Sequence, residues 1–125
     1  MRGKKIVLDL EFIPYRRKQE PYCVHEIIEI GAVALDADNE IYDEFQMYVK
    51  PQYGTVPPFV TAITGITNEM LVGQVSFSEA MQAFEAWLPQ KEPYRFYTWS
   101  GSDQHVFQAE AEWKERPLLG NFYGW

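Results

Sequence analysis

The sequence has a single cysteine, Cys23, among its 125 residues. One chain therefore cannot form an internal disulfide, which excludes a disulfide-stapled extracellular domain and favours a reducing, cytoplasmic location. Long apolar runs are also absent, since none approaches the roughly 18 residues that a membrane-spanning helix needs. We therefore expect a cytoplasmic protein without a membrane partner.

Basic residues are few, because 11 Lys and Arg are set against 18 Asp and Glu, a net charge of -7 at pH 7. This sign argues against a protein that coats nucleic acid without specificity. Residues 1–25 nevertheless hold six basic and three acidic residues, net +3, which leaves -10 for residues 26–125. A basic N-terminal segment on an acidic body suits a phosphate-bearing ligand, although a solvated loop gives the same pattern.

The sequence does contain enough apolar surface for one folded domain. Hydrophobic residues make up 46% of the chain and aromatic residues 16%, and the length suits one domain rather than two. Alternating apolar residues predict strands over residues 4–12, 25–36, 40–50 and 94–99. Helical spacing, together with a capping box at Ser76 and Glu79, predicts helices over residues 76–88 and from about 101 to 113.

The segments between these elements indicate how they connect. Asp and Asn in residues 36–39 predict a tight turn, so the second and third strands should form an antiparallel hairpin. Residues 13–25 are expected to be a loop, and residues 51–71 a long ordered loop with short helical turns. The resulting order, three strands followed by helix, strand and helix, predicts an α/β fold with a crossover helix.

Two carboxylates, Asp9 and Glu11, end a strand that is otherwise apolar on both faces. Alternate residues of a strand project from one face, so both side chains can reach one or two hard divalent cations. If strands 4–12 and 94–99 are parallel neighbours, Asp103 lies near Asp9 and supplies a third ligand. The same residues can be explained without a metal. Asp9 and Glu11 would then be solvent-exposed acids at a strand end, and Asp103 an acid that interacts favourably with the dipole of its helix.

Four segments occur here in the order seen in the DEDD 3'→5' exonucleases: "IVLDLEF", "EIIEIGAVAL", "VPPFVTAITGIT" and "YTWSGSDQHVF". The chain most resembles the branch that contains the RNA-interference-enhancing and histone-mRNA-end nucleases and their bacterial relatives. The resemblance implies an RNase-H-like mixed sheet with an antiparallel hairpin and flanking helices. It also implies a metal-dependent exonuclease that releases nucleoside monophosphates from single-stranded RNA or DNA 3' ends.

The resemblance assigns the metal ligands residue by residue. It implies that Asp9 bridges two Mg²⁺ or Mn²⁺ ions, that Glu11 binds the ion which activates water, and that Asp103 binds the second ion. These three acids are therefore the predicted catalytic and metal-binding residues.

Substrate contacts are predicted at two places. The segment from Thr64 to Thr67 resembles the part of the family that packs against the terminal nucleotide, which makes Ile63, Thr64 and Ile66 candidates for base contacts. The basic residues Arg16 and Arg17 are candidates for contacts with backbone phosphates.

The family's third motif, a general-base His (a Tyr in one subgroup) and a final Asp, has no counterpart before Trp125. We expect residues 1–125 to form a single exonuclease domain of the DEDDh type that lacks its C-terminal third and has little or no activity alone. His25 and His105 are expected to be structural or exposed. The alternative is a non-catalytic nucleic-acid-binding or regulatory protein on the same fold, and an open edge at strand 94–99 predicts a possible homodimer.

Overall fold

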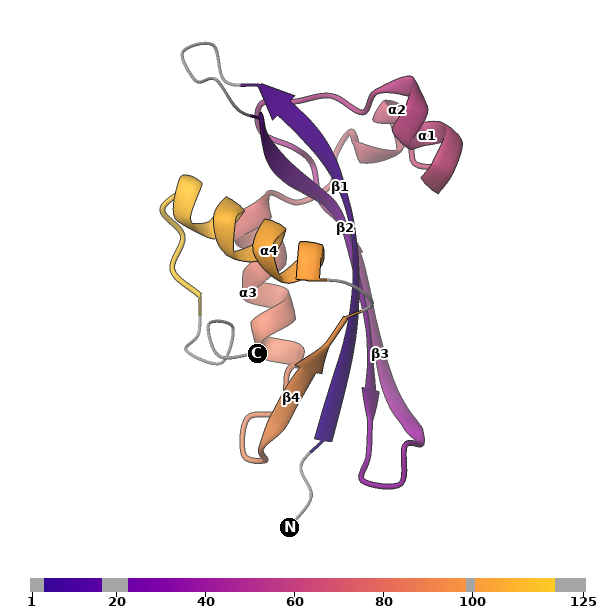
Figure 1. The fold of residues 1–125 in the computed structure, drawn as a ribbon, viewed down its shortest axis with the longest axis vertical. Coiled ribbons are helices and arrows are strands. Elements are labelled where there is room, and N and C mark those ends of the chain that lie inside the picture. The colour runs from indigo at the N-terminus through magenta and orange to yellow at the C-terminus, as the bar shows by residue number, and fades with distance from the viewer. Residues whose placement is uncertain (1–3, 17–22, 99–100, 119–125) are drawn as a thin grey trace.

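The computed structural model describes residues 4–16, 23–98 and 101–118. Four strands form one mixed sheet in the order β3-β2-β1-β4 (Figure 1). The strands β1 (Lys4–Arg16), β2 (Cys23–Leu35) and β3 (Ile41–Tyr48) are antiparallel neighbours, whereas β4 (Tyr94–Tyr97) is parallel to β1. The predicted mixed α/β sheet with an antiparallel hairpin is confirmed, and the first and fourth strands are parallel neighbours, the condition on which the prediction for Asp103 depended.

The strands β1 and β2 are longer than predicted, so the loop expected over residues 13–25 is wrong at both of its ends. β1 continues to Arg16 and β2 begins at Cys23, with Pro14 paired to His25. A proline is tolerated here because β4 pairs with β1 only from Lys4 to Val7, which leaves the outer part of β1 with β2 alone. The two prolines in this segment, read as loop signals, concealed this extension.

The turn between β2 and β3 is confirmed. The Asp36 carboxylate accepts hydrogen bonds from the N–H groups of Asp38 and Glu40, at 2.9 and 3.0 Å. Asn39 adopts a left-handed conformation with φ 63°, which Asn tolerates better than most residues.

Two layers of helices flank the sheet (Figure 1). α3 (Phe77–Trp87) and α4 (Gly101–Trp113) cover one face, while α1 (Pro58–Thr64) and α2 (Asn68–Leu71) lie on the other side, near the outer end of β1 and β2. The predicted α3 and α4 are confirmed, and the two short helices fall where helical turns were expected. No helix in the described ranges is long and apolar enough to cross a membrane.

Strand alternation sorts the side chains of β1 between two cores. Ile6, Leu8 and Leu10 are buried against α3 and α4 in the larger core. The smaller one, called the second core below, lies under α1 and α2 and contains Ile13, Ile28, Val56, Val60, Ile66 and Leu71.

A β-bulge separates these two regions. The pairing of β1 with β2 shifts between Glu11, which faces Glu29, and Phe12, which faces Ile27, so Ile28 is the extra residue. The bulge interrupts the alternation of β2, so Ile28 and Ile30, two residues apart, enter different cores, whereas Ile27 and Ile30 share the larger one. Glu11 therefore lies where the sheet changes register, beside the second core.

The β4 strand forms one edge of the four-stranded sheet. It has only four residues, and a short edge strand offers little backbone for pairing with another chain. The homodimer predicted to form through this edge stays a prediction.

Candidate active site

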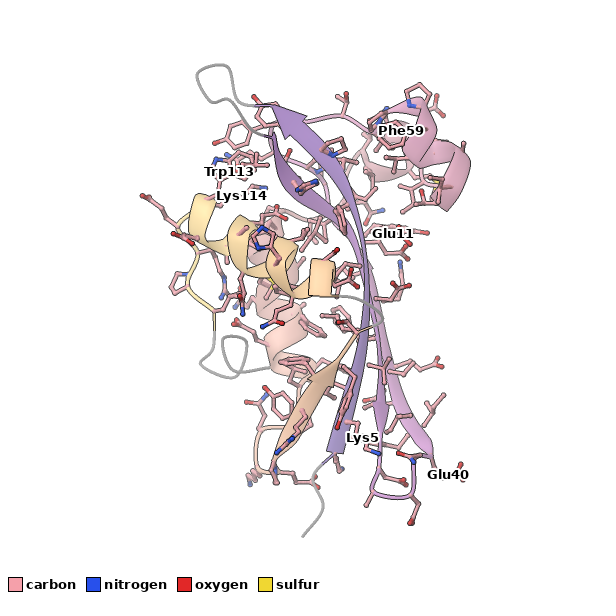
Figure 2. The ribbon with its side chains drawn as sticks, viewed as in Figure 1. Lys5, Glu11, Glu40, Phe59, Trp113 and Lys114 are labelled. Carbon is pink, nitrogen blue, oxygen red and sulfur yellow. The ribbon has the colours of Figure 1, made fainter. Side chains whose placement is uncertain are left out.

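Asp9 and Glu11 project from the face of β1 opposite the larger core. Leu8 and Leu10 are buried under α3 and α4, whereas Asp9 is exposed and Glu11 is half-buried. Figure 2 shows Glu11 on the side of the sheet where α1 and its Phe59 lie. The alternation predicted from the sequence is confirmed at these positions.

Asp103 reaches the same part of β1 from the first turn of α4. β4 ends at Tyr97 and pairs with β1 no further than Val7, so the next stretch of this edge is open to another partner. The Leu10 N–H donates a hydrogen bond of 3.4 Å to Oδ2 of Asp103. Asp103 is buried, with 8% of its surface exposed. The contact places Asp103 beside the backbone that joins Asp9 to Glu11, and these three residues are called the acidic cluster below.

The acids of this cluster repel one another. Burial raises the pKa of Glu11, and the negative charges of Asp9, Glu29 and Asp103 raise it further. Burial likewise raises the pKa of Asp103, with a further increase from Asp9, although the hydrogen bond from Leu10 opposes the shift. A bound cation would relieve this repulsion.

The donor chemistry of the acidic cluster fits a divalent cation, because Mg²⁺ and Mn²⁺ prefer carboxylate oxygens. As placed, however, no three or more His, Cys, Asp or Glu side chains within residues 4–16, 23–98 and 101–118 form a set that could hold an ion. The three acidic residues lie near one another, but their side chains are not arranged as a complete set of metal ligands. Their roles as metal ligands stay predictions.

The predicted base-contact residues have different surroundings. Ile63 is 81% exposed on α1, whereas Ile66 is 2% exposed in the second core. The Thr64 hydroxyl donates to the Val60 carbonyl at 2.8 Å and accepts from the Ile66 N–H at 3.1 Å. Gly65 ends α1 with φ 78°, a conformation that favours glycine. Ile63 is thus available to a ligand, while the surroundings of Thr64 and Ile66 favour support of the turn.

Phe59 was not among the predicted residues, although it shares the exposed surface of Ile63. It is 59% exposed and precedes Ile63 by four residues, so both project from one side of α1. An aromatic residue directly after a Pro-Pro helix start was the available sequence signal.

The remaining predicted residues lie elsewhere. Arg17 and the side chain of Arg16 fall outside the described part of the structure. His25 and His105 line a cavity of about 260 Å³ between β2 and α4. The His25 ring packs edge-on against Phe12 at 5.3 Å, and burial and the nearby His105 lower its pKa. Both histidines therefore lie on the face of β2 opposite the one that carries Asp9 and Glu11, and His105 is exposed.

Comparison with known proteins agrees with this geometry. The profile of the Exonuclease family matches residues 6–113. Human 3'-5' exoribonuclease 1 is 35% identical over 82 residues, which cover 64% of this chain and 24% of that protein. The PolC-type DNA polymerase III of Clostridium perfringens is 37% identical over 79 residues, covering 63% of this chain and 5% of that protein.

The fold has solved counterparts. The nuclease domain of 3'hExo, a DEDDh family member bound to rAMP, superposes with a TM-score of 0.78 at 24% identity, over 95% of this chain and 63% of that one. A second nuclease, cell-death related nuclease 4, superposes with a TM-score of 0.79 at 22% identity, over 96% of this chain and 43% of that one.

This chain therefore belongs to the Exonuclease family, and its fold is that of the RNase-H-like DEDDh nuclease domains. The resemblance inferred from the four sequence segments is confirmed. The chain spans 24% of the human relative and 63% of the solved 3'hExo chain.

Proposed function

We propose that this chain carries the acidic cluster and part of the substrate platform of a divalent-metal-dependent 3'→5' exonuclease that acts on single-stranded RNA or DNA ends. The observation that carries the proposal is the hydrogen bond from Leu10 to Asp103, which joins the helix acid to the strand with Asp9 and Glu11. Family membership and relatives named as 3'-5' exonucleases support the same reaction.

In this proposal Asp9, Glu11 and Asp103 hold Mg²⁺ or Mn²⁺. When bound, the ions would supply an activated water and stabilise the leaving 3'-oxygen. The protein's own part is to keep three carboxylates together despite their repulsion. Because burial and like charge raise the pKa values of Glu11 and Asp103, protons compete with the cation, and metal affinity should fall as the pH is lowered.

The exposed side of α1 is the proposed binding surface for the terminal base of the nucleic acid. Phe59 and Ile63 offer apolar surface next to the side of the sheet that carries Glu11 (Figure 2), and base stacking on aromatic side chains tolerates any sequence. Arg16 and Arg17 are the proposed phosphate contacts, on the basis of charge. A cytoplasmic location also stays a prediction.

The alternative function is that of a protein that binds nucleic acid without cleaving it. Within the described ranges no histidine lies on the face of the acids to serve as a general base, since His25 and His105 face α4 and β2. Such a protein would bind a 3' end in a metal-dependent way and release no nucleotide.

An assay of both cleavage and binding distinguishes the exonuclease from the protein that only binds nucleic acid. We would incubate the chain with 5'-labelled single-stranded RNA and DNA and Mg²⁺ or Mn²⁺, and compare Asp9→Asn with Asp38→Asn, the same change at the exposed hairpin turn. A ladder that shortens from the 3' end, lost in Asp9→Asn but kept in Asp38→Asn, supports the exonuclease. Metal-dependent binding without a ladder supports the alternative, and neither binding nor cleavage contradicts both.

A further inference from the structure

A buried charge network lies apart from the acidic cluster and has no role in the function proposed so far. Glu26 on β2 is fully buried, Glu110 on α4 is 1% exposed, and Lys114 follows the end of α4. The Lys114 ammonium donates to both carboxylates, at 2.8 Å to Glu26 and 2.7 Å to Glu110. Buried carboxylates are costly unless they are paired in this way.

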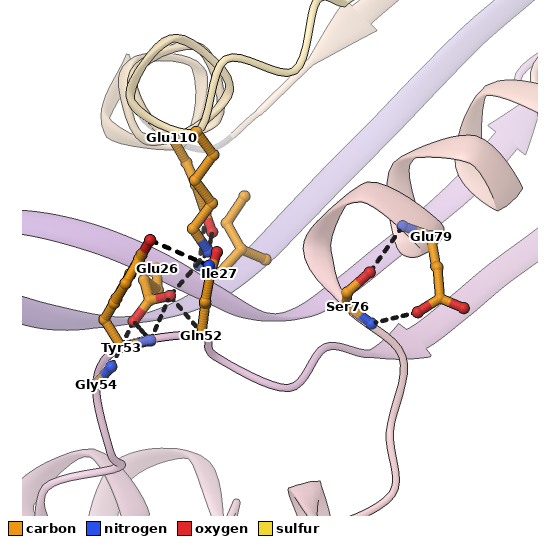
Figure 3. A network of polar contacts seen from close by, with 9 residues as sticks. Glu26, Ile27, Gln52, Tyr53, Gly54, Ser76, Glu79 and Glu110 are labelled. Atoms are coloured by element: carbon orange, nitrogen blue, oxygen red, sulfur yellow. Dashed lines mark hydrogen bonds and ion pairs between the residues drawn. The ribbon is translucent and has the colours of Figure 1, made fainter.

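Glu26 holds the loop that leads to α1. Its carboxylate accepts hydrogen bonds from three successive backbone N–H groups, those of Gln52 at 2.7 Å, Tyr53 at 3.2 Å and Gly54 at 2.7 Å (Figure 3). Charge-assisted hydrogen bonds of this kind are stronger than bonds between neutral groups. One side chain of the sheet therefore fixes three residues of a connecting segment.

Gly54 makes this close approach possible. A Cβ atom at this position would lie 3.2 Å from Oε1 of Glu26 and 3.0 Å from Cδ1 of Ile13, both too close for ordinary contact. A larger residue would therefore crowd the contact and require the loop, Ile13 or the Glu26 carboxylate to shift by a few tenths of an ångström.

The same loop is also fixed to α2. The Val56 N–H donates to Oδ1 of Asn68 at 2.7 Å, and Nδ2 of Asn68 donates to the Val56 carbonyl at 3.1 Å. Val56 is itself buried in the second core. Residues 58–71 are called the α1–α2 platform below. The loop before it is bonded to the sheet through Glu26 and to α2 through Asn68, so it joins the platform to the sheet.

The network extends to the helix that carries Asp103. Glu110 accepts the Ile27 N–H at 2.6 Å, so α4 is bonded to the residue that follows Glu26 on β2. Lys114 then connects Glu110 with the carboxylate that holds the loop. The network joins the elements that carry Asp103 and the exposed Phe59 and Ile63.

We propose that Glu26 is a positioning residue, whose carboxylate fixes the α1–α2 platform relative to the acidic cluster and thereby sets the affinity for a nucleic-acid 3' end. The ligand in this statement rests on the proposed function, whereas the fixing of the platform does not. The competing explanation is that the network stabilises the fold as a whole and has no particular effect on the platform.

Two variants disturb the contact in independent ways. Glu26→Gln keeps the size of the side chain and removes its charge, whereas Gly54→Ala keeps the charge and crowds the contact between the loop and the carboxylate. The control is Glu85→Gln, which breaks the ion pair between Glu85 and Arg116, at 2.7 Å, without touching residues 52–54. If one variant fails to fold, the other still tests the contact.

Two measurements decide the proposal: amide hydrogen exchange of the free proteins, and the dissociation constant of a 5'-labelled single-stranded RNA in Ca²⁺ by fluorescence anisotropy. We expect Glu26→Gln and Gly54→Ala to speed exchange in residues 52–71 by about tenfold and to raise the dissociation constant by about tenfold, with Glu85→Gln near wild type in both.

The outcomes that overturn the proposal are distinct from failure of the proposed function. Exchange that rises in residues 52–54 only, or equally across the whole chain, shows that Glu26 does not fix the platform. Faster exchange of the platform with an unchanged dissociation constant shows that its position does not set affinity. If the wild-type protein binds no RNA, the proposed function fails, and the exchange data alone decide whether Glu26 fixes the platform.

Discussion

At the scale of single residues, repulsion between the carboxylates of the acidic cluster opposes the ionisation of Glu11. Glu11 is half-buried close to Asp9, Glu29 and Asp103, whose charges oppose its ionisation. A carboxylate in such a place destabilises the protein without a cation, and the cost is accepted where a cation or substrate offsets it.

Removing the Glu11 charge should therefore stabilise the metal-free protein slightly. We expect Glu11→Gln to raise the free energy of unfolding at pH 7 by less than about 1 kcal/mol, because the group is partly exposed and water screens the repulsion. Urea denaturation in EDTA measures this change, with Glu40→Gln in the distant hairpin turn (Figure 2) as the matched control. A clear loss of stability in Glu11→Gln would show that the carboxylate makes favourable contacts in the empty site.

At the scale of elements, the α1–α2 platform combines a buried underside with an exposed apolar surface. Val60, Ile66 and Leu71 anchor it in the second core, while Phe59 and Ile63 face outward. Exposed apolar side chains that gather beside a charged cluster commonly mark a binding surface.

A substitution on the exposed surface of α1 should weaken RNA binding and leave stability unchanged. Ile63→Ala removes a side chain that is 81% exposed, so the free energy of unfolding should stay within about 0.5 kcal/mol of wild type. The dissociation constant for single-stranded RNA should rise several-fold. The control is Val72→Ala, a change at a side chain that is 73% exposed just beyond α2. Equal RNA affinity in wild type and Ile63→Ala would remove Ile63 from the proposed base contact.

The start of α3 gives a test of fold rather than function. Ser76 accepts the Glu79 N–H at 3.2 Å, and Glu79 accepts the Ser76 N–H at 3.2 Å. Ser76→Ala should lower the free energy of unfolding by about 1 kcal/mol, the usual cost of a lost N-cap. Ser78→Ala, two residues further along the same helix, serves as the control in urea denaturation. Similar stabilities for the two variants would mean that the capping box contributes little.

Local signals in the sequence were sufficient to predict most elements. The capping box located α3, and the alternation around Asp9 and Glu11 placed the acids on the face opposite Leu10. The parallel pairing of β1 and β4, expected as a condition for the site, brings Asp103 to the strand.

Other features depend on long-range pairing that local patterns do not contain. The extension of β1 past Pro14 is stabilised by its partner strand, so the proline was misread as a loop signal. The roles of Glu26 and Lys114 depend on contacts 88 residues apart in the sequence. An acid inside the apolar run of β2, and a Lys four residues after Glu110, were the available signals.

At the scale of the whole molecule, Glu110 makes stability depend on pH. Its pKa is raised from 4.5 to about 7, mainly by burial and in smaller part by the charge of Glu26. The charge and hydrogen bond of Lys114 and the hydrogen bond from the Ile27 N–H oppose this rise. The folded protein therefore holds this proton at pH values where the unfolded chain has lost it. The stability from Glu110 is complete below about pH 4.5 and is lost as the pH rises through about 7.

Glu110→Gln should remove this part of the pH dependence. The free energy of unfolding of the wild type, minus that of Glu110→Gln, should fall as the pH rises between about 4.5 and about 7. Urea denaturation at several pH values measures the difference, with Glu112→Gln on the exposed side of α4 as the control. A difference that stays constant or rises over this range would show that Glu110 is ionised in the folded protein throughout.

The most direct test of the central claim, that Asp9, Glu11 and Asp103 form one divalent-cation site, is a calorimetric titration of the chain with Mn²⁺. It would compare the wild type with Asp9→Asn, Asp103→Asn and the control Asp38→Asn. We predict binding that weakens at least about tenfold in Asp9→Asn and in Asp103→Asn, since each removes one ligand charge, and that is unchanged in Asp38→Asn. Equal Mn²⁺ affinity in all four proteins, or no binding by the wild type, would contradict the claim.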